Sequence, residues 1–184
     1  MMHAFPCGAP ALDFVGTLRA RRNASPAEKL DSDAALTAWF EESGLVHDAP
    51  DVATGDLEAA IALREAVYDL VSARRRGEAI PGSAREIVNR FAEGMPIGVR
   101  LDGAVRRSGT VTQGLSSLAR QAVEIVGGED AALLRECARP ECTQVYLDRS
   151  RGHRREWCAM KTCGNRVKAA NFRARHRAGA EASA

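Results

Sequence analysis

The sequence contains no apolar run long enough to cross a membrane and no segment that resembles a secretory leader. Its first 22 residues lack a basic start followed by an apolar stretch, and Asp13 interrupts the one apolar run there. A membrane helix needs about 18 successive apolar residues, and a leader needs both of its parts in order. We therefore expect a cytoplasmic protein with no membrane partner, in which clustered cysteines indicate metal or redox chemistry rather than disulfides.

The chain also lacks the side-chain groupings from which active sites are built. No histidine stands at a recognisable spacing from a carboxylate or a nucleophile, and there is no glycine-rich phosphate loop. Motifs of both kinds have defined spacings because the reacting groups must reach one another. We expect no catalytic residue and no enzyme activity.

Lysine is scarce, with three residues among 26 basic ones, and the charge is unevenly distributed. Residues 1–148 hold 16 basic and 22 acidic residues, a net charge of −6, whereas residues 149–184 hold ten and two, a net charge of +8. A basic block indicates a polyanion partner, although many charged runs only keep a surface solvated. The positive charge falls on the segment that carries Cys158 and Cys163, two of the five cysteines.

The first 136 residues predict a mainly α-helical domain with one small β-hairpin, an α+β fold. Apolar residues recur at three- and four-residue steps, which predicts helices over residues 32–42, 56–76, 83–93, 112–126 and 129–134. From residue 97 to residue 105 apolar residues alternate around Asp102-Gly103, a turn sequence that favours a hairpin. We expect residues 1–136 to bury a core of their own.

Four cysteines follow the pattern C-x4-C-x15-C-x4-C: they are Cys137, Cys142, Cys158 and Cys163. Two close pairs separated by a 15-residue excursion suit a tetrahedral zinc ion, because each pair supplies two thiolates from one tight turn. Four thiolates leave no position for a reactive water, so we expect one structural Zn2+. The sequence predicts a treble-clef or ribbon-like finger over residues 137–177 and a disordered tail over residues 178–184, with Cys7 an ordinary thiol.

A helix over residues 163–177 is predicted at the fourth ligand. The residues that share one face at 100° per residue are Cys163, Val167, Ala170 and Ala174. We expect this face to pack over the metal. Phe172 lies roughly opposite, where it can stack on a ligand or contact the N-terminal domain. Arg166 and Lys161 lie near enough in sequence to neutralise the net charge of a zinc tetrathiolate.

The finger resembles a known family. Residues 163–166 are Cys-Gly-Asn-Arg, the motif of the CGNR zinc finger family, and residues 142–150 and 154–160 are similar to the rest of that finger. The resemblance implies that the four cysteines ligate zinc. In that family the finger follows an N-terminal ABATE domain, whose opening is similar to Ala-Leu-Asp-Phe-Val-Gly-Thr-Leu at residues 11–18, with Gly16 in place of a commoner asparagine. Such proteins are described as stress-induced transcription regulators.

Three functions are compatible with these patterns. The first is a regulator that binds DNA through basic side chains of the finger, with candidate contacts at Arg154, Arg155, Arg166, Lys168, Arg173, Arg175 and Arg177. The second is a protein-interaction module in which the basic finger docks on the acidic N-terminal domain or on another protein. The third is a thiol switch in which oxidation releases zinc. The sequence also leaves open whether the N-terminal domain binds a small molecule or a protein partner. It equally leaves open whether the protein forms a homodimer.

Overall fold

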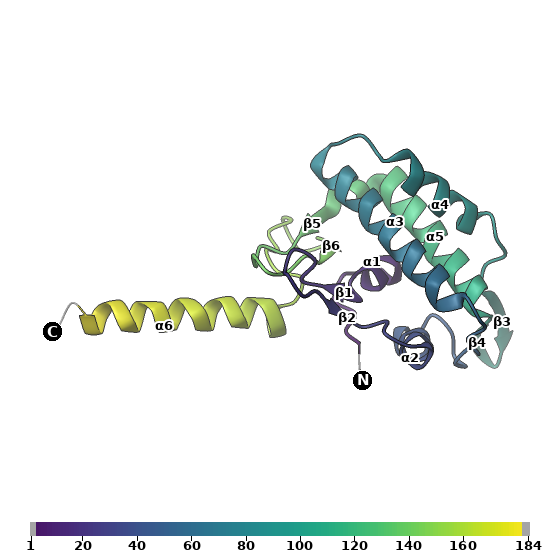
Figure 1. The fold of residues 1–184 in the computed structure, drawn as a ribbon, viewed down its shortest axis with the longest axis horizontal. Coiled ribbons are helices and arrows are strands. Elements are labelled where there is room, and N and C mark those ends of the chain that lie inside the picture. The colour runs from purple at the N-terminus through teal and green to yellow at the C-terminus, as the bar shows by residue number, and fades with distance from the viewer. Residues whose placement is uncertain (1–2, 182–184) are drawn as a thin grey trace.

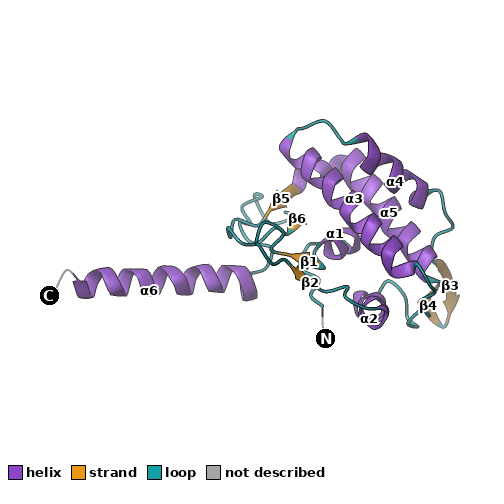
Figure 2. Cartoon of the chain, in the orientation of Figure 1, coloured by secondary structure: helices purple, strands orange, loops and turns teal. Residues whose placement is uncertain are grey.

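The computed structural model describes residues 3–181, with the side chains of residues 3–176 (Figures 1 and 2). Its α-helices are α1 (Pro10–Val15), α2 (Asp33–Ser43), α3 (Asp56–Arg76), α4 (Gly82–Ala92), α5 (Val111–Gly127) and α6 (Asn165–Glu181). Its strands are β1 (Leu18–Arg19), β2 (Ala27–Glu28), β3 (Gly98–Asp102), β4 (Ala104–Ser108), β5 (Leu134–Glu136) and β6 (Val145–Leu147). A 3-10 turn, η1 (Glu129–Leu133), precedes β5, and a π-helical turn, η2 (Met160–Gly164), precedes α6.

The long helices α3, α4 and α5 lie side by side and form the largest layer of the molecule (Figure 1). The apolar stripe predicted on α3 is buried, with Leu63, Val67 and Val71 fully covered. Gly77 ends α3 in the left-handed region at φ 69°, a conformation that glycine adopts without strain. The mainly helical prediction is confirmed, although residues 129–133 form a 3-10 turn where an α-helix was predicted.

Aromatic side chains join α1 and α2 to this layer. The ring of Trp39 meets that of Phe14 edge-on with centroids 5.0 Å apart, and it meets the ring of Phe40 at 5.4 Å. Phe40 in turn lies against Gly114 of α5, where an added Cβ would stand 2.2 Å from the Phe40 ring. Gly114 therefore allows the close approach of α2 and α5.

The predicted hairpin is formed by β3 and β4, paired antiparallel with Leu101 opposite Val105. Gly103 makes the turn in the left-handed region at φ 67°. Both strands are exposed, and the hairpin lies at the edge of the helical layer (Figure 1).

The helical part and the finger share one hydrophobic core. β5, which the sequence assigned to the N-terminal part, pairs antiparallel with β6 of the finger, Leu134 opposite Leu147. All three side chains of β6 are buried, and α1 packs against this strand. The structure therefore draws no boundary after residue 136, because that cut would divide a hairpin.

The last helix starts later and runs further than predicted. α6 begins at Asn165, after the fourth cysteine, and continues to Glu181, so residues 178–181 of the expected tail are helical. The rest of that tail, residues 182–184, lies outside the described residues. Figure 1 shows α6 projecting away from the body of the molecule. Among the described residues, no helix is long and apolar enough to span a membrane.

Candidate zinc centre and basic helix

The four predicted ligands come together at one point. The sulfur atoms of Cys137, Cys142, Cys158 and Cys163 all lie within 4.8 Å of one another. The Sγ of Cys158 is 3.8 Å from that of Cys142 and 3.6 Å from that of Cys163. A tetrahedral zinc with Zn–S bonds of about 2.3 Å places its sulfurs about 3.8 Å apart, so the cluster fits the ion. The four cysteines form a site for one structural zinc.

Two turns hold the first pair of ligands in place. Cys137 follows β5 and its N–H donates to the carbonyl of Gln144 at 3.0 Å, and the N–H of Cys142 donates to the carbonyl of Arg139 at 2.8 Å. The N–H of Ala138 donates to the carbonyl of Glu156 at 2.8 Å, which brings the first pair to the third ligand. The β5–β6 hairpin thus supplies the framework of the site.

The thiols are coupled electrostatically. The pKa of Cys137 lies well below its ordinary value, because Cys142 and Cys158 hydrogen-bond to its sulfur and the backbone N–H groups of Cys158 and Arg139 also point at it. Cys137 raises the pKa of Cys142, and Cys137 and Cys142 together raise the pKa of Cys158. Zinc binds thiolates and not thiols, so the ion supplies the positive charge that several adjacent thiolates require.

The fourth ligand lies in the π-turn η2 and not at the first turn of the α-helix. The N–H of Gly164 donates to the carbonyl of Ala159 at 3.1 Å. An added Cβ at Gly164 would meet the Met160 sulfur at 2.5 Å and the Trp157 ring at 3.5 Å. Gly164 of the Cys-Gly-Asn-Arg motif therefore leaves room for Met160 and Trp157 to close over the turn.

A cation that the sequence analysis missed lies beside the cluster. The Nη1 of Arg139 is 3.9 Å from the Sγ of Cys163, and its Nε donates to Glu141 at 2.9 Å. Arg139 lies in the loop between the first two ligands, and this position is the signal that could have identified it. It places a positive charge beside the cluster, whereas Arg166 and Lys161, which were expected to neutralise the site, are exposed.

Arg155 is held inside the finger by hydrogen bonds from its Nε and Nη2. Its Nη2 donates to the carbonyl of Pro6 at 2.7 Å and its Nε donates to the carbonyl of Trp157 at 2.8 Å. Its guanidinium also lies 4.4 Å from the centroid of the Tyr146 ring. Asp148 accepts from the backbone N–H of Arg155 at 3.0 Å. The prediction of Arg155 as a DNA contact does not fit this placement, because its donors are used inside the fold.

A buried polar cluster joins the segment 11–18 to the finger. The Asp13 carboxylate accepts from the Cys7 N–H at 2.8 Å, and the Cys7 thiol donates to Gln144 Oε1 at 3.1 Å. Gln144 Nε2 donates to the carbonyl of Gly16 at 3.1 Å. An added Cβ at Gly16 would stand 2.4 Å from that nitrogen, so Gly16 makes room for the glutamine of the finger. Cys7 is thus a structural thiol, and burial raises its pKa.

The described face of α6 that was expected to pack over the metal is exposed. Ala170 and Ala174 are exposed, and Val167 is half-buried. The prediction failed because α6 leaves the zinc site after its first turn and does not lie across it. Phe172 is 56% exposed and its ring contacts that of His176 at 4.2 Å, so among the described residues it does not make the contact with the N-terminal domain that was one of its two expected roles.

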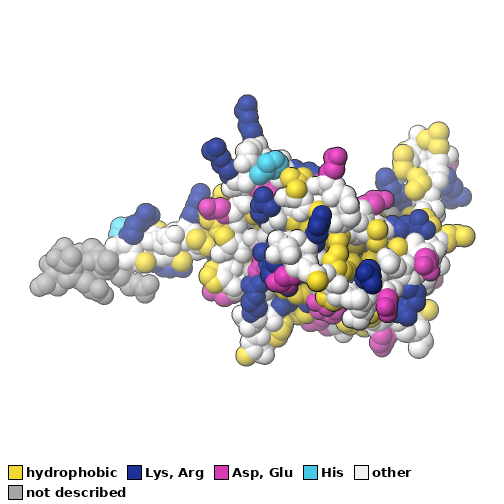
Figure 3. Space-filling model, turned by 90° about the horizontal axis from the view of Figure 1, so that it is seen from above, with side chains coloured by type: hydrophobic (Ala, Val, Ile, Leu, Met, Phe, Trp, Pro, Cys, Tyr) yellow, Lys and Arg dark blue, Asp and Glu magenta, His cyan; other side chains and the backbone are white. Residues whose placement is uncertain are grey.

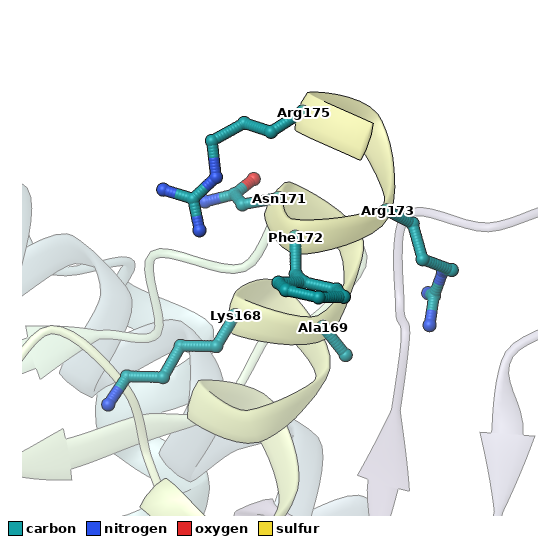
Figure 4. A pocket seen from close by; sticks show the side chains of 6 residues that line it. All are labelled: Lys168, Ala169, Asn171, Phe172, Arg173 and Arg175. Atoms are coloured by element: carbon teal, nitrogen blue, oxygen red, sulfur yellow. The ribbon is translucent and has the colours of Figure 1, made fainter. Parts of the chain in front are cut away.

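The remaining candidate DNA contacts fall into two groups. Lys168 and Arg175 project from one side of α6 into the solvent and Arg173 projects from another, with Phe172 between them (Figure 4). Arg166, in the first turn of α6, and Arg154, in the loop before Cys158, are also exposed. The side chain of Arg177 lies outside the described residues. The structure therefore brings four of the seven candidates together along α6.

Two family models match the chain. ABATE, described as "Putative stress-induced transcription regulator", matches residues 8–129, and the CGNR zinc finger matches residues 134–176. The second range starts at β5, in agreement with the pairing of β5 and β6. No curated protein matches the chain. The two matches confirm the domain order that the sequence motifs implied.

Proposed function

This chain belongs to the ABATE family and carries a CGNR zinc finger, and on that basis we propose that it is a transcription regulator that binds DNA through α6. The zinc ion fixes the turn from which α6 starts. The N-terminal helices bury the core and serve as the module that receives a signal or a partner.

The exposure of α6 is the observation that supports this proposal most strongly. Every described side chain from Lys168 to His176 is exposed. Among the described side chains, none forms an ion pair with Arg166, Lys168, Arg173 or Arg175. An isolated helix of this length that is polar on all sides gains little from packing and is marginal in water. Phosphate contacts would stabilise it, and an α-helix fits the major groove of DNA.

The docking alternative has less support. It requires the basic side chains of the finger to pair with the acidic N-terminal part. Among the described side chains one such pair exists, between Arg149 and Asp130 at 2.6 Å, but Arg149 precedes α6. The four described cations of α6 point to solvent, and an external polyanion suits them better than the body of the same chain.

A catalytic function has no support in the zinc site. The four sulfur ligands complete a tetrahedral shell and leave no position for a water nucleophile. The nearby His153 donates from Nδ1 to the carbonyl of Asp148 at 2.7 Å, which makes it a part of the loop. We therefore propose a structural metal and a binding function.

The salt dependence of DNA binding tests this assignment. Four or five phosphate contacts imply that log K falls with log salt at a slope of about −4. The double variant Arg173→Ala/Arg175→Ala removes two of them and should reduce the slope by about two, with unchanged zinc content. Fluorescence anisotropy with a labelled duplex over a range of salt concentrations measures the slope.

The matched control is Arg85→Ala/Arg90→Ala. It removes the same charge from exposed positions of α4, on the body of the molecule. This variant should keep the slope of the parent protein. Equal slopes for the α6 variant and the parent would refute the assignment of α6.

A further inference from the structure

The β3–β4 hairpin exposes an apolar face that the fold does not cover. Val99 is 66% exposed, Leu101 84% and Val105 50%. These side chains lie on one face, because they are two residues apart on β3 and Leu101 stands opposite Val105. In Figure 3 hydrophobic side chains gather on the projection at the end of the molecule where the hairpin lies in Figure 1.

One edge of the hairpin is covered and the other is open. Arg107 of β4 directs its N–H to Nδ1 of His47 and accepts from the N–H of His47, both at 2.9 Å. Val99 stands opposite Arg107, so its N–H and C=O groups also point out of the hairpin, away from β4. The direction of these groups alternates along a strand, so the N–H and C=O groups of Leu101, two residues further, point the same way. Among the described residues, β3 pairs with β4 alone.

We propose that the open edge of β3 pairs with β3 of a second copy of this chain. With a two-fold axis through Leu101, an antiparallel pair satisfies the outward N–H and C=O groups of Leu101 in both copies, and Val99 lies opposite Gly103 of the second copy. It also joins two hairpins into a four-stranded sheet, with the three apolar side chains of each copy on the same face.

The charges of β3 select one register. When the two-fold axis passes through Leu101, Arg100 stands opposite Asp102 of the second copy, and this ion pair occurs twice. An axis through Arg100 would oppose two arginines, and an axis through Asp102 would oppose two aspartates. Opposite charges stabilise a cross-strand pair, whereas like charges destabilise it. Among the described side chains, none forms an ion pair with Arg100 or Asp102 within one copy.

This register can be tested by reversing single charges. In Arg100→Asp, an aspartate faces an aspartate of the second copy at two places across the axis. In Asp102→Arg, an arginine faces an arginine at the same two places. Each variant alone should weaken the dimer by about tenfold or more. An equimolar mixture of the two variants opposes aspartate to arginine at both places and should restore dimerisation. Analytical ultracentrifugation of the full chain, and native mass spectrometry with one variant tagged, measure these states.

The mixture also controls for folding, because a variant with a damaged hairpin could not form the mixed dimer. Arg90→Asp on α4 makes the same change of net charge away from the hairpin and should leave the dimer unchanged. A parent protein that stays monomeric at high concentration would overturn the proposal. Single variants that dimerise normally, or a mixture that stays monomeric, would overturn it as well.

Discussion

At the scale of single residues, the zinc ligands and the polar cluster around Asp13 differ in how far the sequence predicts them. The four cysteines were predicted because each pair lies within one turn, the spacing of the two pairs indicates zinc, and the motif at residues 163–166 resembles a zinc finger family. The contacts of Cys7 with Gln144, 137 residues apart, leave no local pattern. The need for a residue without a Cβ at Gly16 likewise becomes apparent only from the structure, in which the side chain of Gln144 lies against it.

Asp13 gives a prediction about pH. Burial is the largest cause that raises its pKa from 3.8 to about 6, and the hydrogen bond from the Cys7 N–H only partly opposes this. The folded state therefore holds the proton more strongly than the unfolded state. The contribution of Asp13 to stability is fully present below about pH 4 and is lost as the pH rises through about 6.

The loss amounts to about 3 kcal/mol over that window, roughly half of it above pH 5. Asp13→Asn keeps an oxygen acceptor for the Cys7 N–H but cannot ionise. Urea unfolding of both proteins between about pH 5 and 7.5 should show the parent losing stability relative to Asp13→Asn as the pH rises. The comparison cancels the acid sensitivity of the zinc site, which both proteins share. A difference that stays constant with pH would contradict the raised pKa.

At the scale of elements, the periodic helices were predictable and the short strands were not. α3 has six turns of apolar repeat, which specify a helix without any knowledge of its neighbours. β5 has three residues and exists because β6 pairs with it, so the sequence assigned Leu134 to a helix. The predicted packing of α6 was wrong for another reason, since the spacing of Ala170 and Ala174 defines a face but does not supply a surface to cover it.

The zinc finger should lose its fold without the metal. Cys163→Ser removes one ligand and should retain only a small part of the one zinc per chain that the parent protein holds. Because zinc binding supplies folding free energy in such domains, and because Cys137, Cys158 and Cys163 belong to the common core, the melting temperature should fall by about 10 °C or more. Elemental analysis and calorimetry measure both effects.

Cys7→Ala is the control for that experiment, because it removes a cysteine outside the cluster. It should keep stoichiometric zinc. Stoichiometric zinc in Cys163→Ser would contradict the assignment of this residue as a ligand.

At the scale of the whole molecule, the finger and the helical part are parts of one body, from which α6 projects. The sequence placed a boundary after residue 136 because composition and cysteine content change there. The structure instead continues the core through Val145, Tyr146 and Leu147, which are 0–2% exposed and lie against the N-terminal helices. Composition cannot reveal this continuity, because it depends on which surfaces meet.

The account rests on α6 as the DNA-binding element, and a chain that ends at residue 164 tests this most directly. It keeps the four cysteines and the common core, so it should bind one zinc and melt close to the temperature of the full chain. The measurement is the affinity of both proteins for the same labelled duplex at about 100 mM salt. Loss of the phosphate contacts of α6 should weaken binding by about 100-fold. A truncated, zinc-loaded protein that binds the duplex as tightly as the full chain would contradict the account.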